Sequence, residues 1–109
     1  MPVALVGPNS HLKVRYPVPR GGWIEYDVEA DKPVTTYVLD EEGLSQFYNG
    51  RTDYITSYYG GFPNRRDHYQ QLKLPFKKGH WYLVIKNDQD KSVAVHYEVS
   101  SPGESPPTS

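Results

Sequence analysis

Apolar residues recur at every second position in several short segments of this chain, and this spacing limits the folds open to it. In residues 92–99, valine or tyrosine occupies every odd position; in residues 24–30, the even positions are apolar and acidic residues stand between them. Because successive side chains of a β-strand point to opposite faces, each segment predicts a strand with one buried face. No stretch keeps a helical apolar period for three turns, so the pattern favours an all-β fold.

Further strands are predicted around these two. Residues 80–86 are aromatic or β-branched almost throughout, which predicts a strand buried on both faces. The polar run at 87–91 predicts a turn that joins this strand to residues 92–99 as a hairpin. Lys32-Pro33 is predicted to end the strand that begins at Ile24. The remaining strands are expected at 11–16, 34–39 and 70–74, and one or two helical turns at 41–48.

Strands at short intervals, with glycine and proline between them, predict an antiparallel β-sandwich or jelly-roll-like domain with at most one short helical turn. The 109 residues fit one domain, which we place at residues 1–99. Residues 100–109 are rich in serine and proline and contain no residue suited to a core. They are predicted to be a disordered tail or a linker.

Composition narrows the function classes. The formal net charge of −1 argues against a chain that is basic all over, and double-stranded nucleic acid is not an expected partner. The chain has no cysteine, so it has no disulfide, no thiolate nucleophile and no cysteine zinc site. It shows no signal peptide, and its longest apolar run is far below the about 20 residues that span a bilayer. We therefore expect a cytoplasmic protein without a membrane partner.

Charge is unevenly placed along the chain. Seven acidic residues and one lysine lie between Glu25 and Glu42, whereas six basic and two acidic residues lie between Gly50 and His80. This division predicts either an acidic and a basic flank or two ordinary solvated strand faces.

The segment from Tyr48 to Arg66 is the main candidate for a binding site, because it gathers aromatic rings, glycines and arginines without a regular period. The candidate residues are Tyr48, Arg51, Tyr58, Tyr59, Gly60, Gly61, Arg65 and Arg66. Such a loop can stack on a nucleotide base or a sugar ring and bind phosphate through the arginines. Alternatively, the tyrosines cap the core and Gly60-Gly61 forms a turn with positive φ. Trp23, on the polar face of its strand, is a candidate interface residue.

Catalysis has weaker support. Ser57 is not surrounded by a nucleophile elbow, and His68 follows Asp67 directly, so on a strand the two side chains point to opposite faces. The four histidines stand on separate segments without metal-ligand spacing. The sequence therefore predicts no enzyme, no metal site and no cofactor.

Four motifs occur in an order that resembles a small bacterial family of unknown function. They are Phe47–Arg51, Tyr58-Tyr59-Gly60-Gly61, Leu72–Pro75 and Gly79–Ile85. Members of that family look like compact β-sandwiches, and some are joined to TIR domains of bacterial signalling or defence proteins. The chain departs from the family at Asn49, where lysine is frequent, and in a longer segment between Gly61 and Leu72. A looser likeness is to GOLD-type sandwiches.

The resemblance implies a fold and a signalling or defence context, and no activity. Together with the residue patterns, it predicts a non-catalytic binding or interaction module. The expected partner is a protein, either a second copy or a fused or associated signalling domain. The alternative is recognition of a glycan or nucleotide through the segment 48–66.

Overall fold

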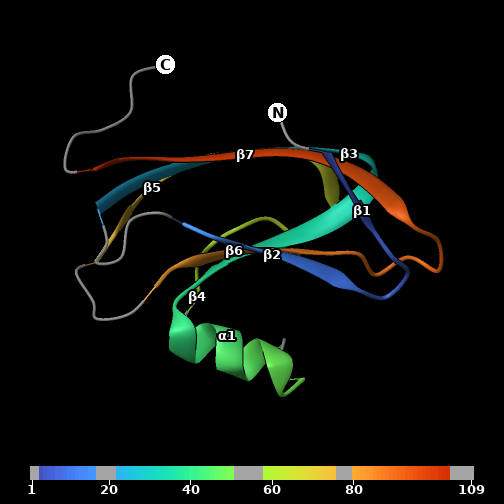
Figure 1. Ribbon diagram of the computed structural model, residues 1–109, viewed down its shortest axis with the longest axis horizontal. Helices are drawn as coiled ribbons and strands as arrows, with labels where there is room; N and C mark the ends of the chain where they lie inside the picture. Colours follow the sequence, from blue (N-terminus) through green and yellow to red (C-terminus); the bar gives the residue numbers. More distant parts are fainter. Residues whose placement is uncertain (1–2, 17–21, 51–57, 76–79, 104–109) are drawn as a thin grey trace.

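The computed structural model describes residues 3–16, 22–50, 58–75 and 80–103, and in these the chain forms seven antiparallel strands and one short helix (Figure 1). The strands are β1 (Val3–Val6), β2 (His11–Arg15), β3 (Gly22–Leu39), β4 (Tyr58–Gly60), β5 (Arg65–Leu74), β6 (Tyr82–Lys86) and β7 (Val93–Gly103), and the helix is α1 (Glu41–Tyr48). The predicted all-β class with a short helical segment is confirmed.

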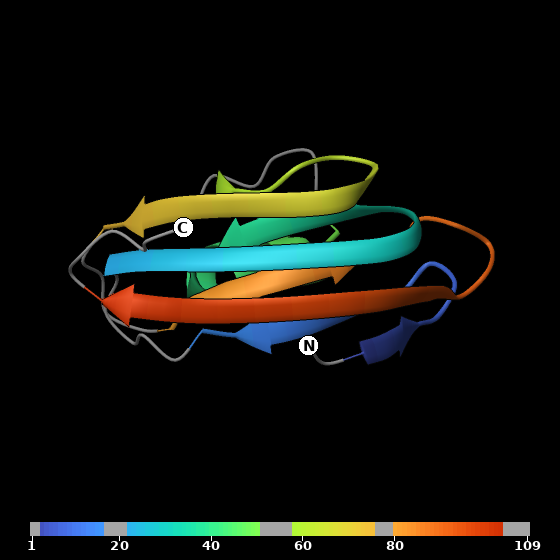
Figure 2. The same cartoon turned by 90° about the horizontal axis from the view of Figure 1, so that it is seen from above.

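The strands form two layers that share β3. Residues 22–30 of β3 lie between β7 and β5, and β1 pairs with the far side of β7; this is the first layer (Figure 2). Residues 35–39 of β3 pair with β6, whose other neighbour is β2, and the end of β3 also pairs with β4; this is the second layer. Because one strand serves both layers, the sheet is barrel-like and nearly closed.

The prediction that Lys32-Pro33 ends a strand is wrong. Strand β3 continues through both residues for 18 residues, and its pairing with β5 shifts register between Glu29 and Val34. An irregularity of this kind bends a strand without ending it, and it can place a proline where the sheet needs no N–H donor. The bend carries the chain from the first layer to the second.

The predicted hairpin of residues 80–86 with 92–99 is also wrong. Both strands exist, but β6 pairs with β2 and β3, whereas β7 pairs with β1 and β3. The polar segment between them crosses from one layer to the other. Strand β7 also runs to Gly103, with Ser100 opposite Glu25, so it passes the domain end predicted at residue 99. Residues 104–109 of the predicted tail lie outside the described residues.

The core lies between the layers, and the helix adds a smaller one outside. Ile24, Tyr26 and Val28 are fully buried between the layers, as their alternation predicts. On the outer face of the second layer, Leu44 and Phe47 of α1 pack against Val84 and Leu39 (Figure 1).

This second core explains why β6 is apolar at consecutive positions. Leu83 and Ile85 face the main core, and Val84 faces the helix. The prediction of a strand buried on both faces is therefore confirmed.

Asp40 caps the helix by accepting a hydrogen bond of 2.8 Å from the N–H of Gly43. No helix in the described part of the chain is long and apolar enough to cross a membrane.

Candidate functional site

The residues of the predicted binding segment fall in different parts of the fold. Tyr48 ends α1, Gly60 ends β4, and Arg65 and Arg66 begin β5. Arg51 lies outside the described residues. Tyr58 and Tyr59 are described as the backbone of β4, which pairs with the end of β3.

The turn between β4 and β5 is fixed by close packing of its glycines against neighbouring chain. A Cβ atom on Gly60 would lie 2.4 Å from Leu72 Cδ1. Gly61 has φ +126°, and a Cβ atom there would lie 2.1 Å from the carbonyl oxygen of Thr36. Positive φ and near contact with backbone each require glycine. The prediction that Gly60-Gly61 serves a turn with positive φ is confirmed for Gly61.

Buried and half-buried polar side chains of β3 and β5 hold this turn. The amide group of Gln70 accepts at Oε1 from the N–H of Gly61 (3.0 Å) and from the hydroxyl of Tyr26 (2.9 Å). The N–H of Phe62 donates to Thr36 Oγ1 over 3.1 Å. Strand pairing stops at this turn, so its N–H groups need other acceptors. The side chains of Gln70 and Thr36 supply them.

His68 is the buried titratable group of this network. Its Nε2 faces two carbonyl oxygens, of Arg65 at 2.7 Å and Val34 at 3.1 Å, so Nε2 carries the hydrogen. Nδ1 then accepts from the Thr36 hydroxyl at 3.0 Å. Burial lowers the pKa of His68, although its two backbone hydrogen bonds act in the opposite direction. Asp67 is exposed, so the two neighbours do point to opposite faces as predicted.

We expect the protein to lose stability as the pH falls from about 7 to about 5. The ring of His68 is neutral in the fold and has a pKa below that of the unfolded chain, about 6.5, so the unfolded state takes up the proton first. The stability that neutral His68 contributes is present above pH about 6.5 and falls by at most about 1.4 kcal/mol per pH unit below it. Chemical denaturation at a series of pH values measures this slope.

His68→Gln should flatten the slope. His11→Gln is the matched control, because burial also lowers the pKa of His11 but its ring is only half-buried, against Phe47. If the slope remained in His68→Gln and disappeared in His11→Gln, the pH dependence would come from His11, and its assignment to His68 would be wrong.

The exposed side of the turn carries two arginines. The guanidinium of Arg65 lies over the ring of Phe62, 4.8 Å from its centroid. Arg66, the next residue of β5, is also exposed, and its side chain belongs to the opposite face of the strand. The stacking holds one cation at the surface, where it can meet an anionic group.

Tyr48 belongs to a different cluster, on the helix side. Its ring is 53% exposed and packs edge-on against His11 of β2. The ammonium group of Lys13 lies 5.8 Å from the ring centroid of Tyr48 and 5.5 Å from that of Tyr82. The ammonium group of Lys13, from the chain itself, therefore already lies near both rings. This contact connects β2 to α1 and β6.

The outer face of the first layer is acidic. Glu25, Asp27 and Glu29 alternate along β3, with Asp67 opposite Glu29 and Glu98 opposite Asp27. Burial raises the pKa of Asp27, and its acidic neighbours raise it further. One of the two charge flanks that the sequence predicted therefore lies on this face.

Trp23 stands near one end of the acidic face. It is half-buried, with Lys73 of β5 opposite it in the register.

Sequence reasoning missed strand β1 as a candidate surface. Val3 and Leu5 are 61% and 73% exposed, and β1 stands at the end of the strand order with β7 as its one partner among the described strands. The period of a strand places Val3 and Leu5 on one face. However, all four residues of β1 are apolar, so the sequence does not show which of its two faces is exposed to solvent.

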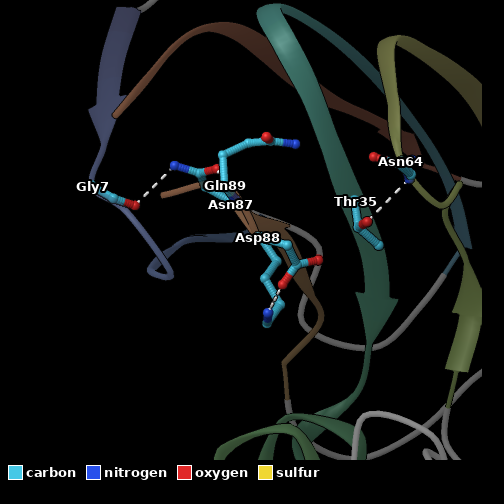
Figure 3. Close-up of polar contacts among 7 residues, drawn as sticks. Gly7, Thr35, Asn64, Asn87, Asp88 and Gln89 are labelled. Carbon is cyan, nitrogen blue, oxygen red and sulfur yellow. Dashed lines mark hydrogen bonds and ion pairs between the residues drawn. The ribbon is translucent and has the colours of Figure 1, made fainter. Parts of the chain in front are cut away.

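Asn87 fixes the end of β1. Its buried amide Nδ2 lies within hydrogen-bond distance of three carbonyl oxygens, of Gly7 (3.0 Å, Figure 3), Val6 (3.1 Å) and Lys91 (2.8 Å), so its two hydrogens are shared among three acceptors. Its Oδ1 accepts from the N–H of Gln89 at 2.8 Å. One side chain therefore joins the β1–β2 turn to the β6–β7 connection, and β1 is held as a rigid margin of the first layer.

The class that these features define is a small antiparallel β domain with a barrel-like sheet. Its fold is similar to that in the solved structure titled "Crystal structure of PirA", with a TM-score of 0.50 and 17% sequence identity over 88% of this chain and 91% of that chain. No family model matches the chain, and no curated protein matches it by sequence.

Proposed function

We propose that this chain is a non-catalytic module that associates with other proteins by strand addition at β1. The observation that carries the proposal is an edge strand without a charged residue, Val3–Val6, whose outward side chains Val3 and Leu5 are largely exposed. An edge strand presents unpaired N–H and C=O groups, and an added strand satisfies them.

The edge strands β2 and β5 carry charges that oppose such pairing. Strand β2, at the opposite end of the strand order, contains Lys13 and Arg15, and β5 contains Arg65, Arg66 and Asp67. Charged residues on an edge are a common protection against unwanted strand pairing. Their absence from β1 supports a strand that is meant to be paired.

The cellular context is part of the proposal. The order of the Tyr58–Gly61 and Gly79–Ile85 motifs supports kinship with the bacterial β-sandwich family and a place in a cytoplasmic signalling or defence protein. In this chain Gly61 and Trp81 of those motifs serve packing: one makes a close turn and the other is buried in the core. The motifs thus support a shared architecture and supply no activity.

The second candidate function is recognition of a small anionic ligand, such as a nucleotide, beside the β4–β5 turn. It is favoured by the stacked Arg65–Phe62 pair, which holds one guanidinium group at the surface beside the turn. Guanidinium groups bind phosphate through paired donors, so a nucleotide fits this chemistry better than an uncharged sugar.

An amide-resolved NMR titration tests the two candidates. A short peptide of alternating threonine and valine, added in millimolar amounts, is expected to shift the amides of β1. Leu5→Lys should weaken this binding about tenfold, because it removes roughly 1.5 kcal/mol of apolar burial and adds a charge to the edge.

Tyr69→Lys is the control for that variant, since Tyr69 is also exposed but lies on β5, at the other edge of the first layer. Equal loss in both variants would contradict strand addition at β1. A separate titration with nucleotides that shifts only residues 62–66, while the peptide shifts nothing, would favour the second candidate instead.

A further inference from the structure

We infer that the strand added to β1 is β1 of a second copy of this chain, antiparallel to it about a two-fold axis at Ala4. This inference rests on the proposed function, because it requires β1 to accept a strand. It goes further by naming the partner, the register and the symmetry.

The hydrogen bonds of β7 show which backbone groups of β1 are directed outward. The N–H of Ala94 donates to the carboxylate of Asp31, over 3.0 Å, and therefore points toward β3. Hydrogen-bonding direction alternates along a strand, so Val93 and Val95 direct their groups toward β1. Their partners in the register are Val6 and Ala4.

It follows that Val3 and Leu5 direct their N–H and C=O groups away from β7, toward the free edge. These are also the two residues whose side chains are exposed on the outer face. Backbone donors, backbone acceptors and apolar side chains are thus offered by the same two residues.

A two-fold axis at Ala4 pairs these residues with each other. Val3 of one copy lies opposite Leu5 of the other, and Leu5 opposite Val3, and both are pairs that exchange two hydrogen bonds. The outer face then brings together two valines and two leucines, which form favourable cross-strand pairs. The four-stranded first layer becomes a continuous sheet across both copies.

Charge favours a second copy over a charged partner. A two-fold contact is self-complementary, so any charge near the axis meets its own kind and repels it. Val3–Val6 contains no charge, which makes it compatible with itself. A strand such as β2, with Lys13 and Arg15, is not compatible in this sense.

The small area of the contact limits its strength. Stable dimers bury about 1,600 Å² in total, and one four-residue strand against another supplies much less. We therefore expect a weak dimer that forms at high protein concentration, and a covalent trap is the suitable test.

The chain has no cysteine, so single cysteines can report the register. At the axis, Ala4 faces its own counterpart in a pair that makes no hydrogen bonds, with Cα atoms about 4.5 Å apart, which a disulfide can bridge. Leu5 of the two copies is diagonal, at about 7–8 Å, beyond normal disulfide reach.

Ala4→Cys is expected to form a covalent dimer at least about tenfold faster than Leu5→Cys under mild oxidation, with full-length chain at high concentration. The faster reaction at the less exposed position cannot come from random collision, because Leu5 is 73% exposed and Ala4 is partly buried. Equal rates, or a faster Leu5→Cys, would overturn the register. The NMR spectrum of each reduced variant establishes that it is folded.

Sedimentation of the wild-type chain completes the test. A concentration-dependent dimer that Leu5→Lys abolishes supports the inference, and a monomer at all concentrations overturns it. If the chain stays monomeric and Ala4→Cys does not cross-link, but the threonine–valine peptide still shifts β1, self-pairing is wrong and strand addition stands. If the peptide also fails, both are wrong.

Discussion

Gly61→Ala is expected to lower the free energy of unfolding by about 3 kcal/mol or more. The φ of +126° belongs to a region that costs a non-glycine residue on the order of 1–3 kcal/mol. A Cβ atom would in addition lie 2.1 Å from the carbonyl oxygen of Thr36, in the part of β3 that pairs with β6, where backbone cannot move aside. Denaturation by urea, with an unchanged dependence on denaturant, measures the loss.

Gly50→Ala is the matched control. Gly50 also has positive φ, +74°, but no atom lies within 4 Å of the position of its Cβ. The exchange should cost only the conformational penalty, on the order of 1–2 kcal/mol. Similar losses at both glycines would mean that the contact with Thr36 contributes nothing to the requirement for glycine.

The alternation of the sequence predicted strands at the places of β2, β3, β5, β6 and β7, and missed β1 and β4. It succeeded where it reports a local property, the face to which each side chain points. Ile24, Tyr26 and Val28 are buried in β3 for this reason. The consecutive apolar residues around Val84 likewise predicted burial on both faces, and α1 supplies the second cover. The fold class could therefore be predicted in full.

Alternation does not report which strands pair. It could not show that β6 and β7 belong to different layers, because a polar turn between two strands fits a crossing as well as a hairpin. It also could not show that β3 continues through Pro33, since a bulge keeps the chain extended where proline normally ends pairing.

The candidate site was predictable in part. The role of Gly61 in a turn follows from glycine chemistry, and the structure confirms its positive φ. The burial of His68 could have been predicted from alternation, because His68 lies on the same face of β5 as Leu72 and Leu74. Its partners Thr36 and Val34 were not, since they are more than 30 residues away.

Asn87 shows most clearly what the sequence pattern could not predict. As part of a polar run it predicts an exposed turn, yet its side chain is fully buried and bonds to Val6, which is 81 residues earlier in the chain. Only the crossing of β6 to β7 beside the β1–β2 turn creates this environment. A residue with such partners is expected to be sensitive to the smallest chemical change.

Asn87→Asp replaces one amide NH₂ by oxygen and is expected to destabilise the fold by about 3–5 kcal/mol at neutral pH. The exchange removes the Asn87 donor from the carbonyl oxygens of Val6, Gly7 and Lys91, although Gly7 keeps the N–H of Ser10, and it sets a carboxylate oxygen against all three. Unsatisfied buried groups cost about 1–3 kcal/mol each, and a buried unpaired charge adds to this. Urea denaturation against wild type measures the difference.

The penalty should depend on pH with a defined sign. Burial beside carbonyl oxygens raises the pKa of the introduced carboxyl above its unfolded value of about 3.9. The protonated form, which can donate one hydrogen bond, is therefore favoured in the fold, and the variant loses stability relative to wild type as the pH rises from about 4 to about 7. Taking the difference from wild type removes the contribution of His68, which both proteins share.

Asn9→Asp provides the matched control, because it makes the same chemical exchange in the same β1–β2 turn at an exposed position. Its cost should stay within about 0.5 kcal/mol, and its difference from wild type should vary little with pH. If Asn87→Asp were equally mild, the amide of Asn87 would not be what holds the end of β1. The rigid edge on which self-pairing depends would then need another explanation.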